Sequence, residues 1–493
     1  MNNAVRLRTV LCILICIANY ALGANPQEKP DLQKEQISTT KHKMQLNGKE
    51  LQYTAIAGFL PIMNESNEVQ ANMFFTAYIK DGQDSVKRPV AFAFNGGPGA
   101  SSVWLHLGCL GPKRVVLEGD GNSSPYALID NEYTWLDSTD IVLIDPVGTG
   151  FSFATDEKNE KDFFEIHKDV SSVGSFIRLF LTKYQRWQSP KYLIGESYGT
   201  LRAVGLLNHL PREYGVQIDG VALISSALNF ETIMFKRGND LPYSLYLPSY
   251  TAAAWYHKKL NKDLQADLYK AIKESRDWAE NKYLVMLAKG DNLSADEQSE
   301  LSENLAKYTG LAPAFIKNNN FRIEVFTFIS KLLEDNRLQT GLMDSRMTIV
   351  TVPPDYDYVD PSLLSAQIKL STAFNEYLAK DLDIHILKPY KTLSSKVNSG
   401  WQWGSASGGF VDFTGDLSKA IVANEKLKIF AAMGYYDLTT PFRTQEYSFD
   451  HLGLPAALRK NIHCFYYPSG HQIYTSQESI KKLKDDIGHF FSE

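Results

Sequence analysis

The stretch that decides the fold is KYLIGESYGT, residues 191–200. Its pentad GESYG, residues 195–199, matches the G-x-S-x-G pattern, in which a serine lies on a sharp turn between a buried strand and a helix. An apolar strand precedes the pentad at Tyr192–Ile194. Apolar residues then recur every three positions and indicate a helix that we expect to end before Pro211: Leu201, Val204, Leu207 and Leu210. The sequence therefore predicts strand, sharp turn and helix around Ser197.

Five further apolar runs of strand length alternate with helical stretches along the chain. Gly, Pro, Asp or Ser bounds each run: Val90–Phe94, Ile141–Ile144, Val221–Ser225, Lys428–Ala432 and His463–Tyr467. Strands that alternate with helices favour a mostly parallel central sheet flanked by helices. Together with the sharp turn at Ser197, this order predicts an α/β fold of the α/β-hydrolase type.

A long interval between two of these strands has a helical pattern instead. Ser294–Glu297 has the form of a capping box at the start of a helix. Three apolar residues before it recur at helical spacing: Leu264, Leu268 and Ile272. We expect a helical insertion at residues 230–345 that caps the carboxyl ends of the strands and limits the access of water. The α/β-hydrolase core then comprises residues 45–229 and 346–493.

The N-terminus has the three-part layout of a secretory signal peptide. Arg6 and Arg8 precede the apolar run Val10–Ala18, and small residues then provide a cleavage point. A membrane anchor is the alternative, but an apolar run this short spans a bilayer poorly. We therefore expect residues 1–24 to be removed and the protein to be exported, to a periplasm, the extracellular space or a lysosome-like lumen. The polar residues 25–44 should form a loose mature N-terminus.

The composition is that of an ordinary globular protein. The chain has 493 residues, of which 44% are hydrophobic and 22% charged, with a net charge of -5 and a pI of about 6.1. These values indicate neither a nucleic-acid surface nor a polybasic membrane patch, and no other apolar run has membrane-spanning length. A small molecule or a peptide is the expected partner, and the oligomeric state is open. Cys109 and Cys464 could form a bridge or stay two buried thiols.

The serine of the pentad needs a base, and the base needs an orienting acid. Proteins of the α/β-hydrolase fold supply them in the chain order Ser, acid, His. Asp437 and His471 each follow a predicted strand, and loops at the carboxyl ends of parallel strands meet at one edge of the sheet. We therefore predict Ser197 as nucleophile, Asp437 as acid and His471 as base. The structural alternatives are a turn aspartate and a surface histidine, and His463 is the second choice for the base.

A glycine-rich segment, FNGGPGASS at residues 94–102, follows the strand VAFAF. Its Gly-Gly-Pro-Gly run can neither continue a strand nor begin a helix, so we expect a tight loop with outward-pointing backbone N–H groups. In this fold such a loop supplies half of the oxyanion hole, and the residue after the nucleophile supplies the other half. We predict the amides of Gly97 and Tyr198 for this role, with an ordinary turn as the alternative.

Five segments together resemble the signature blocks of the serine carboxypeptidase family of α/β-hydrolases. They are FNGGPGASS (94–102), IDPVGTGFS (144–152), GESYGT (195–200), GYYDLTTPF (434–442) and SGHQIY (469–474). The resemblance implies a helical insertion in the fold, no metal and no cofactor, and release of C-terminal residues from peptides through an acyl-enzyme. It also implies that Ser197, Asp437 and His471 are the catalytic residues.

The resemblance further implies that Asn95 and Glu196 bind the free C-terminal carboxylate of a peptide substrate. Two carboxylates in contact cannot both stay ionised, so they share a proton and a pKa rises. This accounts for the carboxyl group directly beside Ser197 and predicts a preference for acidic pH. The alternative is that Glu196 is a surface carboxylate without a role.

Some positions depart from the pattern of the family. The usual Trp before the Asn-Gly-Gly run is Ala93 here and the usual Cys after it is Ala100, and with the low cysteine count this is more similar to a bacterial branch. Residues 238–257 are rich in aromatic side chains, which either line the substrate cleft or pack in a core. A family acyltransferase or esterase with the same triad, and an inactive peptide-binding protein, are the alternative functions.

Overall fold

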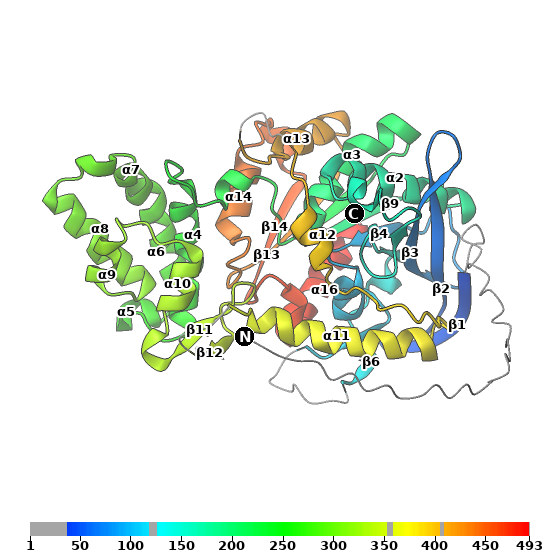
Figure 1. Cartoon of the computed structure of the whole chain (residues 1–493), viewed down its shortest axis with the longest axis horizontal. Coiled ribbons are helices and arrows are strands. Elements are labelled where there is room, and N and C mark those ends of the chain that lie inside the picture. The colour runs from blue at the N-terminus through cyan, green and yellow to red at the C-terminus, as the bar shows by residue number, and fades with distance from the viewer. Residues whose placement is uncertain (1–36, 118–125, 353–357, 405–408, 493) are drawn as a thin grey trace, which may run out of the picture. The chain divides into compact units, whose positions relative to one another are not determined.

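The computed structural model describes most of the chain (Figure 1), namely residues 37–117, 126–352, 358–404 and 409–492. The predicted signal peptide, residues 1–24, lies outside the described residues, as do residues 25–36. Ten of the described strands form one sheet in the order β1-β2-β3-β7-β4-β9-β10-β13-β14, with β8 beside β3. Their bounds are β1 Ile37–Leu46, β2 Lys49–Met63, β3 Val69–Lys80, β4 Val90–Phe94, β7 Asp140–Ile144, β8 Phe153–Ala154, β9 Lys191–Glu196, β10 Gly220–Ile224, β13 Lys428–Gly434 and β14 Ile462–Tyr467.

The part of the sheet from β7 to β14 is parallel, whereas β1, β2 and β3 pair antiparallel with their neighbours. All six predicted strands are confirmed, with ends that differ from the prediction by no more than two residues. A mostly parallel sheet flanked by helices is the predicted α/β-hydrolase fold. In such a sheet the carboxyl ends of the parallel strands lie at one edge, where loops can build a site.

The structure corrects the prediction of a loose segment at residues 25–44 over its described part, residues 37–44. β1 begins at Ile37, which lies opposite Gly58 of β2. The polar side chains of β1 alternate between exposed and half-buried positions, and Met44 and Leu46 are buried. A half-exposed strand at the edge of a sheet needs few apolar residues, so its composition is similar to that of a loop.

Side chains of the parallel strands alternate between two apolar cores, one on each face of the sheet. In β4, Phe92 and Phe94 belong to one core, and Ala91 and Ala93 belong to the other. Helices cover both faces (Figure 1): α2 Ile166–Lys183, α3 Tyr198–Tyr214 and α13 Thr414–Ala423 on the first, and α11 Pro361–Lys380 and α16 Gln477–Ser492 on the second. Strands that are buried on both faces explain why the predicted runs are almost wholly apolar.

Helix α3 differs from the prediction at its end. It continues through Pro211 to Tyr214, and Gly215 closes it in the left-handed conformation at φ 65°. A proline inside a helix removes one backbone hydrogen bond and disturbs the turn before it. Because α3 packs along β9 and α2, tertiary contacts outweigh that local cost here.

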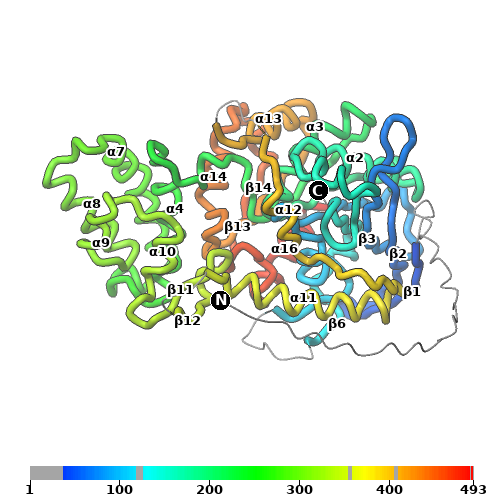
Figure 2. The backbone as a smooth tube through the Cα atoms, viewed as in Figure 1, coloured from blue at the N-terminus to red at the C-terminus, as the bar shows by residue number. Residues whose placement is uncertain are grey.

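The insertion is a group of helices to one side of the sheet (Figure 2). Ser294 and Glu297 form the predicted capping box at the start of α8. The apolar spacing at Leu264 and Leu268 spans two helices rather than one, because Asp267 caps the start of a new helix. The helices are α4 Leu241–Tyr256, α5 Lys262–Gln265, α6 Leu268–Trp278, α7 Leu284–Leu287, α8 Ala295–Thr309, α9 Pro313–Asn318 and α10 Val325–Lys331.

The insertion has an apolar core of its own. Three tyrosines from the aromatic stretch 238–257 are buried in this core: Tyr243, Tyr246 and Tyr250. Core packing, one of the two expected roles, therefore accounts for them. Tyr256, from the same stretch, is 43% exposed and contacts the ring of Tyr436 edge-on.

The remaining described α-helices and β-strands are short. They are α1 Val103–Leu105, β5 Lys113–Val115, β6 Leu128–Asp130, β11 Leu338–Thr340, β12 Thr348–Val350, α12 Ser395–Gly400, α14 Phe442–Asp450 and α15 Ala456–Arg459. Cys109 and Cys464 are both free thiols, so they do not form the bridge that their number allowed. Within the described ranges, no helix combines the length and the apolar character needed to cross a membrane.

Candidate active site

The turn between β9 and α3 has the geometry of a nucleophile elbow. Ser197 lies between Glu196, which ends β9, and Tyr198, which begins α3, at φ 58° and ψ -128°. A methyl group on Gly195 would lie 2.3 Å from the carbonyl oxygen of Gly199, so the strand and the helix approach too closely for a side chain at that position. The two glycines of the pentad are therefore steric requirements of the turn that presents Ser197.

Asp437 and His471 form a buried hydrogen-bonded pair. Nδ1 of His471 lies 2.8 Å from Oδ2 of Asp437, and neither side chain is exposed. Oδ1 of Asp437 accepts hydrogen bonds from the amides of Thr439 and Thr440 at 2.7 and 3.0 Å, and Oδ2 accepts one from the Thr440 hydroxyl at 2.8 Å. A carboxylate that is fixed at both oxygens orients the imidazole that it holds.

The parallel strands bring this pair to Ser197, because β9, β10, β13 and β14 are consecutive neighbours in the sheet. Ser225, directly after β10, connects their loops: its hydroxyl donates to the carbonyl of His471 at 2.6 Å, and its carbonyl oxygen lies 3.1 Å from the Thr440 hydroxyl. The amide of Ser197 donates to the carbonyl of Ile224 at 3.0 Å. The structure thus brings all three predicted triad residues together at one edge of the sheet.

His471 has the environment of a general base. Burial lowers its pKa, but the charge and hydrogen bond of Asp437 and the charge of Glu196 raise it, and the net direction is upward. Nε2 is buried and has no hydrogen-bond partner among the described residues, so the contact with Ser197 is not closed in this state. Such contacts often tighten only when substrate binds.

The glycine loop after β4 packs directly on the start of α3. A methyl group on Gly96 would lie 2.4 Å from the amide nitrogen of Tyr198 and 2.7 Å from that of Gly199. Gly97 follows at φ 101°, in the region that favours glycine. The amides of Gly97 and Tyr198, the predicted donors of the oxyanion hole, therefore lie on adjoining segments next to Ser197.

Asn95 and Glu196 form a second buried pair beside the elbow. Nδ2 of Asn95 donates to Oε1 of Glu196 at 2.9 Å, and Oδ1 of Asn95 accepts from the amide of Leu105 at 3.0 Å. Glu196 is only 3% exposed, which rules out the alternative of a surface carboxylate. Its Oε2 is buried and has no hydrogen-bond partner within the described part of the chain.

The electrostatic environment of Glu196 favours its neutral form. Burial raises the pKa of Glu196 to about 7, although the charge of His471, the hydroxyl of Tyr474 and the amide of Asn95 favour the ionised form. A neutral carboxyl group can donate a hydrogen bond, which a carboxylate cannot. The free oxygen of Glu196 can therefore offer a proton to an anionic group in the site.

Two residues of the site were missed by the sequence reasoning. Thr440 holds Asp437, and the phenol of Tyr474 lies close enough to Glu196 to affect its pKa, though without hydrogen-bond geometry. Both residues lie inside segments that resemble family blocks, GYYDLTTPF and SGHQIY. That position is the only signal in the sequence that could have identified them.

Arg202 supports the substrate side of the site from within α3. Its Nη1 donates to the carbonyl of Asn95 at 2.7 Å and its Nε to Oδ2 of Asp169 at 2.8 Å. The hydroxyl of Tyr198 donates to the same Oδ2 at 2.8 Å, and both members of the ion pair are buried. One buried ion pair thus joins the loop of Asn95 to the start of α3.

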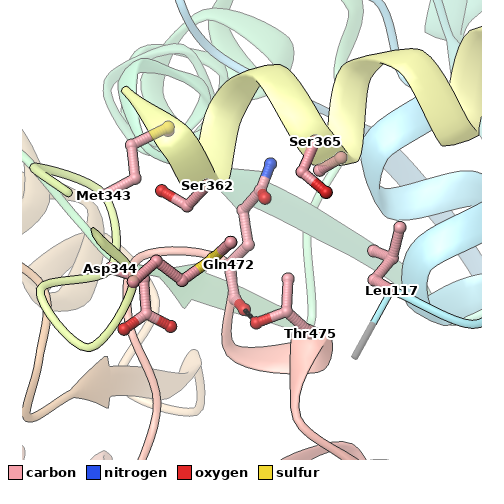
Figure 3. Close-up of a pocket in the computed structure, with 9 residues that line it drawn as sticks. Leu117, Met343, Asp344, Ser362, Ser365, Gln472 and Thr475 are labelled. Carbon is pink, nitrogen blue, oxygen red and sulfur yellow. Dashed lines mark hydrogen bonds between the residues drawn. The ribbon is translucent and has the colours of Figure 1, made fainter. Parts of the chain in front are cut away.

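A small cavity of about 30 Å³ adjoins the loop after His471 (Figure 3). Four segments line it, and Figure 3 shows the Gln472 side chain among them: Leu117, Met343 with Asp344, Ser362 with Ser365 of α11, and Gln472 with Thr475. The hydroxyl of Thr475 donates to the carbonyl of Gln472 at 2.9 Å. The cavity has room for roughly one water molecule, so it is too small to bind a peptide residue.

Comparisons with known proteins agree with this geometry. The profile of a family described as serine carboxypeptidase matches residues 46–484. Serine carboxypeptidase-like 13 of Arabidopsis thaliana is 26% identical over 48% of this chain and 56% of its own length. The venom serine carboxypeptidase of Apis mellifera is 28% identical over 38% of this chain and 38% of its own. The matched region thus spans about half or less of these curated relatives.

A solved structure shows the same fold. The prohormone-processing carboxypeptidase Kex1(Δ)p from Saccharomyces cerevisiae matches with a TM-score of 0.55 and 17% identity, over 89% of this chain and 91% of that one. At this identity the likeness concerns the fold alone. The expected similarity to a bacterial branch stays a prediction.

Proposed function

The chain belongs to the serine carboxypeptidase family, and we propose that it is a serine-type carboxypeptidase that releases C-terminal residues from peptides. The observation that carries the proposal is the buried pair of Asn95 and Glu196 directly beside Ser197. An enzyme that acts on simple esters gains nothing from a buried neutral carboxyl group next to its nucleophile. A free peptide C-terminus, in contrast, is an anion to which that group can donate a hydrogen bond.

In the proposed reaction, Ser197 attacks the scissile carbonyl while His471 accepts its proton and Asp437 stabilises the imidazolium. The amides of Gly97 and Tyr198 stabilise the negative charge that develops on the carbonyl oxygen. His471 then gives the proton to the leaving amino group, and an acyl-enzyme forms. Water, deprotonated by His471, attacks the acyl-enzyme and releases the shortened peptide.

The environment of Glu196 supports a preference for acidic to neutral pH. Its pKa of about 7 keeps the carboxyl group protonated in that range, so that it can share its proton with the substrate carboxylate. At higher pH two carboxylates would face each other, and peptide binding should weaken. Export, which we expect from residues 1–24, belongs to the same proposal, with a peptide substrate outside the cytoplasm.

A pair of substrates tests the proposal. We expect an N-blocked dipeptide with a free C-terminus to be cleaved at least about tenfold more efficiently than its C-terminal amide, mainly through tighter binding, with Ser197→Ala as the background control. Equal rates on the acid and the amide would contradict a carboxypeptidase. Cleavage or acyl transfer on esters alone would indicate the esterase or acyltransferase alternative, and failure of a phosphonofluoridate to label Ser197 would indicate an inactive binding protein.

A further inference from the structure

The chain returns from the insertion through residues 341–347, between β11 and β12, which we call the return segment. This segment is bonded to the residues on both sides of Asp437. The amide and the hydroxyl of Ser345 both donate to the carbonyl of Tyr436 at 3.0 Å. The amide of Leu438 donates to a carbonyl of the return segment at 3.0 Å. The backbone around the predicted acid is therefore held from outside the α/β core.

The same segment also holds the loop of the predicted base. The amide of His471 donates to the carbonyl of Met343 at 2.6 Å. A methyl group on Gly470 would lie 2.4 Å from that carbonyl oxygen, so the two backbones are in direct contact. A shift of the return segment would thus move His471 as well as the loop of Asp437.

One side chain of the return segment joins the two loops. Nη1 of Arg346 donates to the carbonyl of Pro468 at 2.6 Å, Nη2 to the hydroxyl of Ser469 at 3.4 Å, and the guanidinium lies over the ring of Tyr436 at 5.2 Å. Asp344 holds this group at two points, with Nε at 2.9 Å from Oδ1 and Nη2 at 2.5 Å from Oδ2. The Arg346 side chain is 19% exposed. It therefore contacts the residue before Asp437 and the turn that precedes His471.

We propose that Arg346 is a positioning residue of the triad, which sets the distance between Asp437 and His471 by holding their two loops together. The inference rests on the proposed function for its kinetic tests, but the geometry is independent of the substrate. Lysine could keep the charge of Arg346 but could not make the two-point contact, the carbonyl contact and the ring contact at once. Displacements of about 1 Å in an active site can cost on the order of a hundredfold in rate.

The proposal predicts a change in the pH dependence, because the contact with Asp437 governs the ionisation of His471. The charged groups that face His471 are Asp437 in the loop after β13, Glu196 at the end of β9 and Asp360 at the start of α11, and the Thr440 hydroxyl lies 3.2 Å from Nδ1. Burial lowers the pKa of the imidazole and these carboxylates raise it. If the contact with Asp437 loosens, the pKa of His471 falls and the acidic limb of kcat moves to lower pH.

The experiment compares Arg346→Met and Arg346→Lys with the wild type on one N-blocked dipeptide across the pH range. We expect Arg346→Met to lower kcat by about tenfold or more with little change in KM, and to move the acidic limb to lower pH. In Arg346→Lys, both kcat and the position of the acidic limb should return only partly to their wild-type values. If Arg346→Met does not fold, Asp344→Asn removes the two-point hold and should produce the same shift in smaller measure.

The matched control is Arg322→Met. Arg322 also makes a two-point contact with an aspartate, Asp240, and donates to the carbonyl of Leu287, but these partners belong to the insertion. We expect this variant to keep the wild-type kcat and the wild-type acidic limb. The melting temperature of each variant shows how much stability the substitution removes. A loss of stability alone does not move a limb of the pH profile.

A second readout does not depend on the substrate. The proton between His471 and Asp437 should give a far-downfield proton NMR signal whose pH midpoint moves down in Arg346→Met and stays in Arg322→Met. An unmoved midpoint, with kcat within twofold of the wild type, overturns the role of Arg346. If the wild type cleaves no peptide, the proposed function is contradicted. If the NMR midpoint nevertheless moves down in Arg346→Met, the positioning role of Arg346 still stands.

Discussion

Replacing Glu196 with Gln should remove two losses that the wild type suffers as the pH rises, one of stability and one of activity on peptides. Burial moves the pKa of Glu196 from 4.5 to about 7, which corresponds to about 3 kcal/mol against the ionised form. The folded state therefore keeps a proton that the unfolded chain loses between these two values. The free energy of unfolding of the wild type falls as the pH rises through this window, by up to about 3 kcal/mol. Glutamine does not ionise and is free of this loss.

The same substitution should flatten the alkaline side of the activity profile. With a pKa of about 7, the wild type retains about one hundredth of its protonated Glu196 at pH 9, so kcat/KM on a peptide should fall about a hundredfold from its plateau. In the Glu196→Gln variant, the side-chain amide keeps a hydrogen-bond donor for the substrate carboxylate at every pH. We expect the alkaline fall to disappear in the variant and the acidic limb, which belongs to His471, to stay in place.

The assay has a kinetic part and a stability part. The first measures kcat/KM for one N-blocked dipeptide between pH 5 and 9, with an ester that lacks a free carboxylate as the substrate control. The second measures urea unfolding at pH 4.5 and pH 8, where the variant should gain about 3 kcal/mol relative to the wild type between the two conditions. Glu446→Gln, at a buried glutamate of α14 that pairs with Arg276 and Arg443, is the matched control for the kinetic part and should leave the alkaline limb in place. Identical alkaline limbs for the wild type and Glu196→Gln would refute the shared-proton explanation.

Three other substitutions test separate parts of the site. Ser197→Ala should keep the melting temperature and lower kcat on the order of 10⁴-fold or more, and retention of over a tenth of the activity would exclude Ser197 as the nucleophile. Thr440→Val removes a donor to Asp437 and should lower kcat by about tenfold with little change in KM; an unchanged kcat would mean that the backbone amides suffice to hold the acid. Gly96→Ala places a methyl group 2.4 Å from the amide nitrogen of Tyr198, so the activity should fall and the unfolding free energy should fall by about 2 kcal/mol or more. A wild-type melting temperature in this variant would show that the loop can move.

The fold could be predicted from local patterns because its strongest constraints are local. The strand ends were correct to within two residues, since strands that are buried on both faces leave a continuous apolar run in the sequence. β1, β2 and β3 were all missed, and β1, as an edge strand with one exposed face, has the composition of a loop. The end of α3 was also wrong, because the packing of that helix against its neighbours carries it through Pro211.

The residues of the candidate site likewise comprise some that the sequence identifies and some whose contacts only the structure shows. Ser197 and the glycines around it are visible in the sequence, because close approach of two backbone segments excludes other residues at those positions. The positions after strands pointed to Asp437 and His471, since neighbouring parallel strands end at one edge. The family resemblance pointed to Asn95 and Glu196, but only the structure shows that both are buried and bonded to each other.

The contacts of Thr440, Tyr474 and Arg346 with the triad and its loops were decided by the tertiary structure alone. A threonine, a tyrosine and an arginine have no spacing that marks them in a sequence, and each acquires its role from a partner on another segment. Arg346 contacts Pro468 from 122 positions away in the chain. The sequence by itself determines what a residue can do locally, through steric demands on the backbone and through the period of its apolar neighbours. Packing in the folded chain decides which side chains face each other across such separations. It also decides how far burial shifts their pKa values.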